Sequence, residues 1–314
     1  SDLTNCVNLG MITGVNGPVN GSGVGGILGN SEGNTVIMDC VNSGSIVGKG
    51  TDFQSAGGIL GVASNGASGC NDGIALINII NKGPVSNEGY CTGGIIGLTP
   101  AESPSNEGNI SIINSGNFAD ISGAEFVGGF GVVQAEKGRT TTIELGFSKG
   151  KVTSAGEAKA SFALCLPGEG IISTKNNFYQ EQDGLEGIAT DVEPTDESLK
   201  IEGLNKMEGD AWITQMNQYV NEYNAAHPDG PFAKTWKFDA NNNPVFGLSA
   251  PVIEGKTPFK QETTVTITAL AGAKIYYTLD GSDPASESTP YNDSFTLNEQ
   301  MTVKAIAIMD DLTS

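Results

Sequence analysis

Residues 36–61 read V-I-M-D-C-V-N-S-G-S-I-V-G-K-G-T-D-F-Q-S-A-G-G-I-L-G, and most of the chain before residue 170 repeats this stretch. It holds an N-x-G corner with apolar residues on both sides, followed by a Gly-Gly pair, Ile, an apolar residue and Gly. The corner glycine recurs in steps of 34, 39, 33 and 34 residues, at Gly10, Gly44, Gly83, Gly116 and Gly150. A fixed period of this length is typical of repeat architectures.

Aligning the copies on the corner glycine places similar residues in columns. Two residues before the glycine stand Asn8, Asn42, Asn81, Asn114 and Ser148. Four residues before it stand Cys6, Cys40, Ile79, Ile112 and Gly146, and two residues after it stand Ile12, Ile46, Val85, Phe118 and Val152. The second block gives Gly25-Gly26-Ile27, Gly57-Gly58-Ile59, Gly93-Gly94-Ile95, Gly128-Gly129-Phe130 and Ser161-Phe162-Ala163.

The columns predict a mainly β fold whose first domain, residues 1–170, is a right-handed β-solenoid (β-helix) of about five coils. Equal positions then stack about 4.8 Å apart, one strand spacing. Glycine suits the corners because it reaches positive φ without steric cost, and stacked Asn amides can hydrogen-bond from coil to coil. We therefore expect Asn8, Asn42, Asn81 and Asn114 to be stacked. A β-sandwich is the alternative for short strands and Gly-rich turns, but a fixed period favours the solenoid.

These residues resemble the GLUG-type repeats of bacterial surface and secreted proteins, in which a C-x-N-x-G corner is followed by G-G-I-x-G. Residues 4–62 match closely, 75–98 and 110–132 match well, and 141–166 are degenerate. The resemblance implies an extracellular, adhesin-like or scaffold role, including that of an appendage on larger enzymes.

We predict that residues 171–248 form a capping segment with one or two helices and a hairpin. Thr195 or the next residue, Asp196, can cap a short helix through Lys206, and Asp210 can cap a second helix that Pro228 ends.

One face of the second predicted helix is apolar, with Ile213, Met216, Val220 and Tyr223 at helical spacing. We expect this face to pack on the open end of the solenoid, because repeat proteins need end caps. Residues 236–247 complete the cap as a hairpin around the turn at 239–244.

The last segment, residues 249–314, is predicted to be a separate β domain, because its β-branched stretches alternate in polarity. The stretch I-Y-Y-T-L-D-G-S-D-P at 275–284 and M-T-V-K-A-I-A at 301–307 resemble the immunoglobulin-like domain at the C-terminus of chitobiases and β-hexosaminidases. The resemblance implies an accessory β-sandwich and secretion, without catalytic residues. A final edge strand after residue 309 is expected to be missing or cut short, which would leave the domain truncated.

The formal net charge is −20, from 16 Lys and Arg against 36 Asp and Glu. We expect no nucleic-acid partner and no anionic membrane surface, because both require basic patches. No apolar run approaches the length of a membrane span. Ser1 and the lack of a signal peptide indicate a processed chain or a cut piece, so export is inferred from the family resemblance.

Five cysteines cannot all pair with one another. Cys6 and Cys40 share one column, and we expect both to be buried, adjacent and reduced, serving as small hydrophobic residues. A disulfide between them is the alternative, since adjacent coils lie within disulfide reach. The redox states of Cys70, Cys91 and Cys165 stay open.

No constellation of residues in the sequence carries chemistry, so we expect no catalytic, cofactor-binding or metal-binding residues. His227 is the single histidine and is expected at a helix C-terminus. Residues 239–243 begin like a calcium loop but lack its Gly and Glu, and residues 280–284 are expected to form a turn. The G-x-G-x-x-G spelling at 21–26 does not open a helix, so a phosphate cradle is not expected.

The sequence favours a non-catalytic, exported cell-surface binding or adhesion protein of a bacterium, whose partner is a host or environmental glycan or an extracellular protein. One alternative is a carbohydrate-active β-helix enzyme, a polysaccharide lyase or glycosidase, which needs paired carboxylates in a cleft. The other is a structural spacer of a larger surface protein. An exposed aromatic cluster in a groove would favour glycan binding, and two facing carboxylates would favour hydrolysis.

Overall fold

The computed structural model describes residues 2–15, 23–31, 34–50, 55–63, 73–99, 108–135, 138–156, 158–166, 168–190, 198–230, 232–239, 241–248, 251–269, 273–309 and 312–313. The chain divides into two compact units. The first comprises Ser1–Gln215 with Glu222–Ala233, and the second comprises Met216–Asn221 with Lys234–Ser314. The predicted boundaries at 170 and 248 therefore differ from those of the structure.

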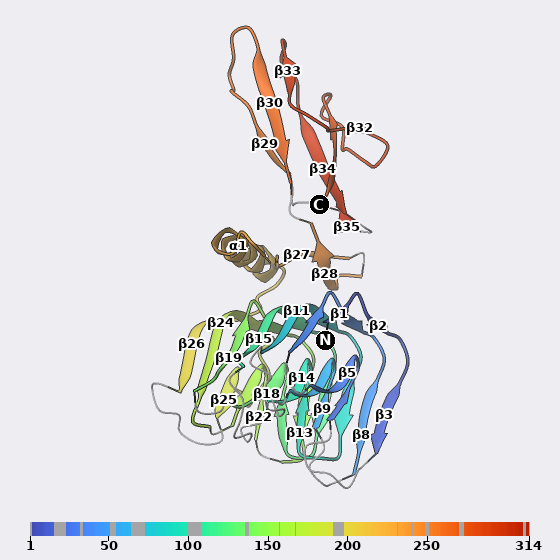
Figure 1. Ribbon diagram of the computed structural model, residues 1–314, viewed down its shortest axis with the longest axis vertical. Helices are drawn as coiled ribbons and strands as arrows, with labels where there is room; N and C mark the ends of the chain where they lie inside the picture. Colours follow the sequence, from blue (N-terminus) through green and yellow to red (C-terminus); the bar gives the residue numbers. More distant parts are fainter. Residues whose placement is uncertain are drawn as a thin grey trace. The chain divides into compact units, whose positions relative to one another are not determined.

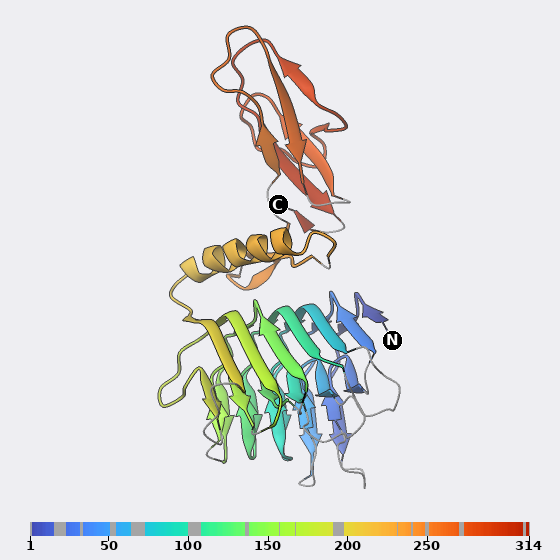
Figure 2. The same cartoon turned by 60° about the vertical axis from the view of Figure 1, so that its left-hand side comes forward.

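The first unit is the predicted β-solenoid, built from four parallel sheets that the chain visits in turn (Figure 1). Sheet A contains β1 (Asp2–Thr4), β6 (Thr35–Met38), β11 (Ile74–Asn81), β15 (Ile110–Asn117), β19 (Thr140–Glu144), β24 (Ile171–Tyr179) and β26 (Leu199–Lys206), extended by β2 (Val7–Asn8), β7 (Val41–Asn42) and β20 (Phe147–Ser148). Its long strands lie side by side in Figure 2.

The other three sheets repeat the same coil-to-coil order. Sheet B contains β3 (Ile12–Val15), β8 (Ile46–Lys49), β12 (Val85–Asn87), β16 (Ile121–Gly123) and β21 (Val152–Ser154). Sheet C contains β4 (Gly23–Gly25), β9 (Ser55–Gly57), β13 (Cys91–Gly93), β17 (Phe126–Gly128) and β22 (Lys159–Ala160). Sheet D contains β5 (Leu28–Ser31), β10 (Leu60–Ala63), β14 (Ile96–Leu98), β18 (Gly131–Val133), β23 (Ala163–Cys165) and β25 (Ile188–Thr190). Among the described residues, sheets B and C thus hold five strands each, separated by four coil-to-coil steps.

Two apolar cores run along the solenoid. Side chains of sheets A and D fill the larger one, in which Leu76, Ile112 and Leu60 are fully buried. Side chains of sheets B and C fill the second, around Ile121 and Val127. This arrangement follows from strand alternation, because successive side chains of a strand point to opposite faces.

A ladder of asparagine side chains stabilises the corner between sheets A and B. The Nδ2 atom of Asn8 donates to Asn42 Oδ1 at 2.7 Å, and Asn42 donates to Asn81 in the same way at 2.8 Å. Gly10, Gly44 and Gly83 are stacked neighbours as predicted, since a Cβ on Gly44 would lie 1.9 Å from the Gly10 carbonyl oxygen. The first three coils confirm the repeat alignment.

The alignment of the fourth coil is wrong by three residues. Asn81 donates to Asn117 at 2.8 Å and pairs with it in register, so Asn117 continues the ladder in place of Asn114. The corner position of this coil is Ala119, not Gly116. The neighbouring columns move with it: Ser115 replaces Ile112 beside Cys40 and Ile79, and Ile121 replaces Phe118 beside Val85 and Val152.

Asn114 instead occupies a second column that the sequence analysis missed. Its Nδ2 atom donates to Asn78 Oδ1 at 2.7 Å. Every member of this column has a positive φ, between 51° and 70°: Asn5, Asp39, Asn78, Asn114, Leu145, Asn176 and Gly203. Asn tolerates this left-handed conformation better than most residues. Because both columns favour Asn, the Asn114-Ser115-Gly116 stretch can be aligned with either column. Only the register of strand pairing shows which alignment is correct.

The second block also shifts in the fifth coil, where Ala160-Ser161-Phe162 and not Ser161-Phe162-Ala163 is equivalent to Gly128-Gly129-Phe130.

The solenoid continues past residue 170, into the segment predicted to cap it. β24 pairs in parallel with β19, and β26 pairs in parallel with β24. The predicted helix ending at Lys206 is therefore wrong for its described part, where 199–206 is a strand, while Thr195 and Asp196 lie outside the described residues. Glycine at 203 with φ 70° fits the left-handed column and disfavours helix.

The second predicted helix is present as α1 (Ala211–Ala226). Asp210 stands at its N-cap position without a side-chain capping hydrogen bond, and His227 is its C-cap. The predicted apolar face is buried, with Ile213, Met216, Val220 and Tyr223 at most 8% exposed. No described helix is both long and apolar enough to cross a membrane.

Within the first unit, the start of α1 packs on the flank of sheet A and not over the open end of the solenoid. The Trp212 ring lies 5.1 Å from that of Phe147 and 5.7 Å from that of Phe178, measured between ring centroids. These two phenylalanines belong to successive coils, and both are fully buried. The expected end cap is thus replaced by a lateral contact, because the flank of the last coils is aromatic.

Within the described part of the second unit, residues 251–313 form two antiparallel sheets consistent with an immunoglobulin-like domain. One sheet has the order β29 (Val252–Glu254), β30 (Thr263–Thr268), β33 (Phe295–Leu297), and the other has the order β32 (Thr289–Pro290), β31 (Lys274–Thr278), β34 (Lys304–Met309), β35 (Leu312–Thr313). Val265, Ile267 and Leu297 are buried between aromatic side chains, including the stacked pair Tyr277 and Phe295, whose ring centroids lie 4.6 Å apart. β35 occupies the place where the final edge strand was expected to be missing or cut short.

The predicted hairpin forms, but it belongs to the second unit. β27 (Thr235–Phe238) pairs with β28 (Pro244–Gly247), and the Lys237 ammonium donates to the Thr313 carbonyl oxygen at 2.8 Å. Its turn is held by Asp239, whose Oδ1 accepts hydrogen bonds from the backbone of Asn241 and Asn243.

Candidate binding groove

In each coil, the strands of sheets C and D lie on the two sides of the Gly-Gly corner and form two neighbouring arms. Where the facing residue is glycine, the backbones of the two arms can come into contact. In the first three coils the residues of sheet D that face sheet C are Gly29, Gly61 and Gly97. A Cβ on Gly61 would lie 2.5 Å from the Val24 backbone nitrogen, and one on Gly97 would lie 2.8 Å from the Ala56 carbonyl carbon. The arms therefore touch through their backbones, and no side chain fits between them.

The same column changes to larger residues in the later coils. Register places Val132, Leu164 and Ala189 after Gly97. A third apolar cluster then forms between the arms, in which Cys91, Val132 and Leu164 are buried and Phe126 is partly buried. Side chains hold the arms apart, and a groove opens between them.

The groove has a volume of about 460 Å³ and opens to solvent. Its lining residues come from sheets C and D and the turns before sheet C: Glu125, Phe126, Gly156, Ala158, Lys159, Leu164, Ala189 and Thr190. Phe126 makes an edge-to-face contact with Tyr90, with ring centroids 4.7 Å apart. The floor is apolar, while Glu125 is exposed and Lys159 half-buried at the rim.

This composition suits binding of a ligand with an apolar or planar face, because ligand sites combine apolar walls with a few placed polar groups. Among the described lining residues Glu125 is the only carboxylate. Hydrolysis of a glycosidic bond ordinarily needs two carboxyl groups about 5 to 9.5 Å apart. Phe126 is the aromatic residue among the described lining residues, and the Tyr90 ring that it contacts lies outside the lining.

The described cysteines, Cys6, Cys40, Cys91 and Cys165, are all free thiols. Burial raises the pKa of Cys91 and of Cys165 to about 12, and raises that of Cys40 to about 11. Such thiols are poor nucleophiles at neutral pH, because the thiolate is the reactive form.

Cys6 and Cys40 are adjacent as predicted, with the Cys6 backbone N–H 3.3 Å from Cys40 Sγ. The expectation that both are buried is wrong for Cys6, which is only half-buried because it lies in the first coil. Cys70 lies outside the described residues.

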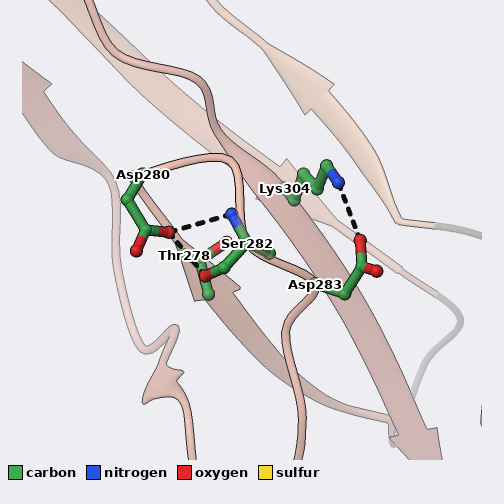
Figure 3. A network of polar contacts seen from close by, with 5 residues as sticks. All are labelled: Thr278, Asp280, Ser282, Asp283 and Lys304. Atoms are coloured by element: carbon green, nitrogen blue, oxygen red, sulfur yellow. Dashed lines mark hydrogen bonds and ion pairs between the residues drawn. The ribbon is translucent and has the colours of Figure 1, made fainter.

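The other sequence motifs have structural roles in the described residues. His227 caps α1 and stacks on Tyr223, with ring centroids 4.2 Å apart. Asp280 accepts hydrogen bonds from the backbone N–H and hydroxyl of Ser282, which closes the predicted turn (Figure 3). The first two residues of the G-x-G-x-x-G spelling, at 21 and 22, lie outside the described residues, and Gly23–Gly25 is strand β4.

Among the described residues no three His, Cys, Asp or Glu side chains lie together in a way that could hold a metal ion. The groove itself was missed by the sequence analysis. The sequence does contain a sign of the groove, because the column of glycines Gly29, Gly61 and Gly97 is followed by Val132. This change can be recognised only when the fourth coil is aligned in the correct register.

Comparison with known proteins supports the assignment of the second unit. Residues 255–314 match the family model of the chitobiase/beta-hexosaminidase C-terminal domain. A comparison with curated proteins found no match. Among solved structures, the chain is similar to a crystal structure from Bacteroides ovatus described as a "putative immunoglobulin A1 protease", with a TM-score of 0.42 and 19% identity over 77% of this chain and 70% of that chain. The resemblance of the solenoid to GLUG-type repeats stays a prediction.

Proposed function

We propose that this chain is a non-catalytic, exported, surface-associated binding or adhesion protein of a bacterium. The groove between sheets C and D is its binding site, and the immunoglobulin-like domain is an accessory spacer. The observation that carries the proposal is the change from glycine to Val132 and Leu164 in one column, which opens an apolar groove lined by Phe126.

Two further observations support binding as the role. The described groove offers one carboxylate, Glu125, and the described thiols have raised pKa values or lie outside it. The net charge of −20 keeps such a protein soluble and opposes contact with nucleic acid and anionic lipid. Export rests on the accessory domain matched at 255–314, which the resemblance links to secretion.

The test is a binding screen of the purified chain against arrayed glycans and extracellular proteins. A ligand that uses the groove should lose at least tenfold in affinity with Ala189→Trp, because the indole fills the space beside Leu164. The matched control is Thr13→Trp, which places the same side chain on an exposed position of sheet B. Equal affinity of both variants for every ligand found contradicts the groove as the binding site.

The enzyme alternative is tested on the same samples. The chain is incubated with host and plant polysaccharides, with and without calcium, and new reducing ends or unsaturated uronates are measured. Turnover that disappears with Glu125→Gln overturns the binding proposal.

A further inference from the structure

The sixth coil closes one of the two apolar cores of the solenoid and leaves the other exposed. Leu185 packs on the core between sheets B and C, and the Gln182 side chain hydrogen-bonds to the backbone of Val152 and Gly150 at the end of sheet B. Sheets A and D instead continue for one more strand each, β26 and β25. These two strands form the C-terminal end of the core between sheets A and D.

Ile201 of β26 shows that the end of this core is exposed to solvent. Strand register places Ile201 in the column of Leu76 and Ile112, whose side chains are fully buried in the core. Ile201 itself is 49% exposed, and Leu199 and Leu204 of the same strand are only partly buried against the core. Removing these side chains from water is favourable, so a surface that covers this end gains hydrophobic stabilisation.

The outer edge of β26 also presents backbone hydrogen-bonding groups. The strand pairs with β24 on one side, and Figure 1 shows it as the outermost strand of sheet A. The Ile172 N–H donates to the Ser198 carbonyl oxygen at 2.8 Å, and in a parallel ladder alternate residues bond to opposite neighbours. The backbone groups of Leu199 and Ile201 therefore point away from β24. An edge of this kind is a template for another strand.

The charges on β26 select which strand fits this edge. Lys200 and Glu202 are both exposed and lie on either side of Ile201 in the sequence. If a second copy of β26 pairs antiparallel across a two-fold axis at Ile201, the two Ile201 residues form a hydrogen-bonded pair, and each Lys200 lies opposite Glu202 of the other copy. The neighbouring two-fold registers place two lysines or two glutamates opposite each other, which is destabilising.

We propose that this end of the solenoid binds a second copy of the same chain and forms a closed two-fold dimer, in which sheet A continues from one copy into the other. Opposed residues of an antiparallel pair lie on the same face, so both Ile201 side chains face the cores and the two exposed ends cover each other. A two-fold interface requires a self-complementary patch, and β26 supplies one.

The length of regular strand at this edge limits the strength of the dimer. Pairing runs from Leu199 to Gly203, where a φ of 70° ends the regular strand geometry. Such a contact belongs with the small, transient interfaces, and we expect a Kd of about 10 to 100 μM.

The test measures self-association of the purified full chain by sedimentation velocity, from about 1 to 500 μM in about 0.15 M salt, which screens distant charges. We expect a reversible monomer–dimer equilibrium. Lys200→Glu and Glu202→Lys each place like charges opposite each other twice, and each should weaken association about tenfold or more. The control Lys274→Glu makes the same change in net charge at an exposed lysine of the second unit, and should change association less than about twofold.

An equimolar mixture of the two single variants is the decisive measurement. Each variant pairs poorly with itself, but one copy of each restores both Lys–Glu contacts, so the mixture should associate to within about threefold of the wild type. The double variant Lys200→Glu/Glu202→Lys should do so on its own, because the exchange keeps opposite charges facing each other. Fluorescence energy transfer between chains labelled at their N-termini with two different dyes reports the mixed dimer.

Each outcome supports or overturns the dimer. A wild-type chain that stays monomeric over this range overturns it. A dimer that either single variant leaves unchanged uses another surface and overturns the proposed interface, as does weakening that neither the mixture nor the double variant reverses. If a single variant fails to fold by circular dichroism, hydrogen exchange of the wild type decides. The amides of Leu199 and Ile201 must then become protected as the concentration rises, and unchanged exchange overturns the proposal.

Discussion

The first three coils of the solenoid and the coils that follow them share one backbone period but differ in how sheets C and D meet. In the first three, Gly61 and Gly97 bring the backbones into contact. In the fourth and fifth coils, Val132 and Leu164 separate them, and a groove of about 460 Å³ results. A repeat fold can therefore change from a closed wall to an open site by substitution in one column, without an insertion. Because the fold alone does not determine function, the column whose residue type changes along the solenoid is the place to look for a functional site.

We call the first three coils the closed half and the coils that line the groove the open half. The largest loss of stability is expected from a substitution that gives the closed half a side chain found in the open half. Gly97→Val supplies the residue that stands at the next position of its column, Val132. Its Cβ would lie 2.5 Å from the Gly61 carbonyl oxygen and 2.8 Å from the Ala56 carbonyl carbon, both backbone atoms that cannot move aside cheaply. We expect a loss of about 3 kcal/mol or more in the free energy of unfolding, measured by urea denaturation.

The matched control for this variant is Ala189→Val in the open half, which should change the free energy of unfolding by less than about 1 kcal/mol. Equal stabilities of Gly97→Val and the wild type would contradict the glycine contact between sheets C and D.

The second effect is the converse change in the open half. Leu164 is 1% exposed and packs between the two arms, so Leu164→Ala leaves a cavity that the rigid coils cannot close. We expect a loss of about 2 to 3 kcal/mol, at the low end for leucine truncation because the groove already lies beside the site. The same urea titration measures it. A loss below about 1 kcal/mol would mean that this side chain does not hold the arms apart.

Much of the closed half could be predicted from the sequence, whereas the open half could not. Gly10, Gly44 and Gly83 stack as the period predicts, because glycine at a tight corner has a strict steric reason to recur. The fourth coil failed because Asn114-Ser115-Gly116 imitates the corner motif while Asn114 fills the left-handed column. Both columns favour Asn, so composition cannot separate them, and only the pairing of Asn81 with Asn117 does.

The groove could not be predicted because its walls come from that misaligned half. Phe126, Leu164 and Ala189 are ordinary apolar residues in sequence, and they become a site only when three consecutive coils are in register. The flank contact of Trp212 on Phe147 and Phe178 was missed for the same reason, since the two phenylalanines are successive members of one column.

The third prediction compares a thiol at the N-terminal end of the solenoid with two thiols in its interior. Cys6, in the first coil, is half-buried, whereas Cys91 and Cys165 are buried and have pKa values raised to about 12. In folded protein at pH 8, a thiol reagent should label Cys6 first and leave Cys91 and Cys165 unlabelled over the same period. Peptide mass spectrometry of the labelled chain reports each site.

After denaturation without reductant, all four described cysteines should be alkylated. A Cys6–Cys40 disulfide in that sample would contradict the structure, in which both are free thiols.

The smallest change in stability is expected for a substitution in the second unit, which lies outside the solenoid and serves as a reference. The Ser282 hydroxyl and backbone N–H both donate to Asp280 Oδ1, and the hydroxyl is the larger cause of a lowered Asp280 pKa (Figure 3). A lowered pKa means that the folded state favours the carboxylate. The associated stability is present above the ordinary aspartate pKa, near 3.9, and is lost as the pH falls through the lowered folded value.

Ser282→Ala removes the hydroxyl, so the Asp280 carboxyl resonance, followed by ¹³C NMR during an acid titration, should move to a higher midpoint. Because Asp280 is exposed and water replaces the missing donor, the unfolding midpoint at pH 7 should change far less than with Gly97→Val or Leu164→Ala. An unchanged Asp280 midpoint would show that the backbone N–H of Ser282 alone maintains the lowered pKa. A large change in stability at pH 7 would show that the turn contributes more to the second unit than its exposure indicates.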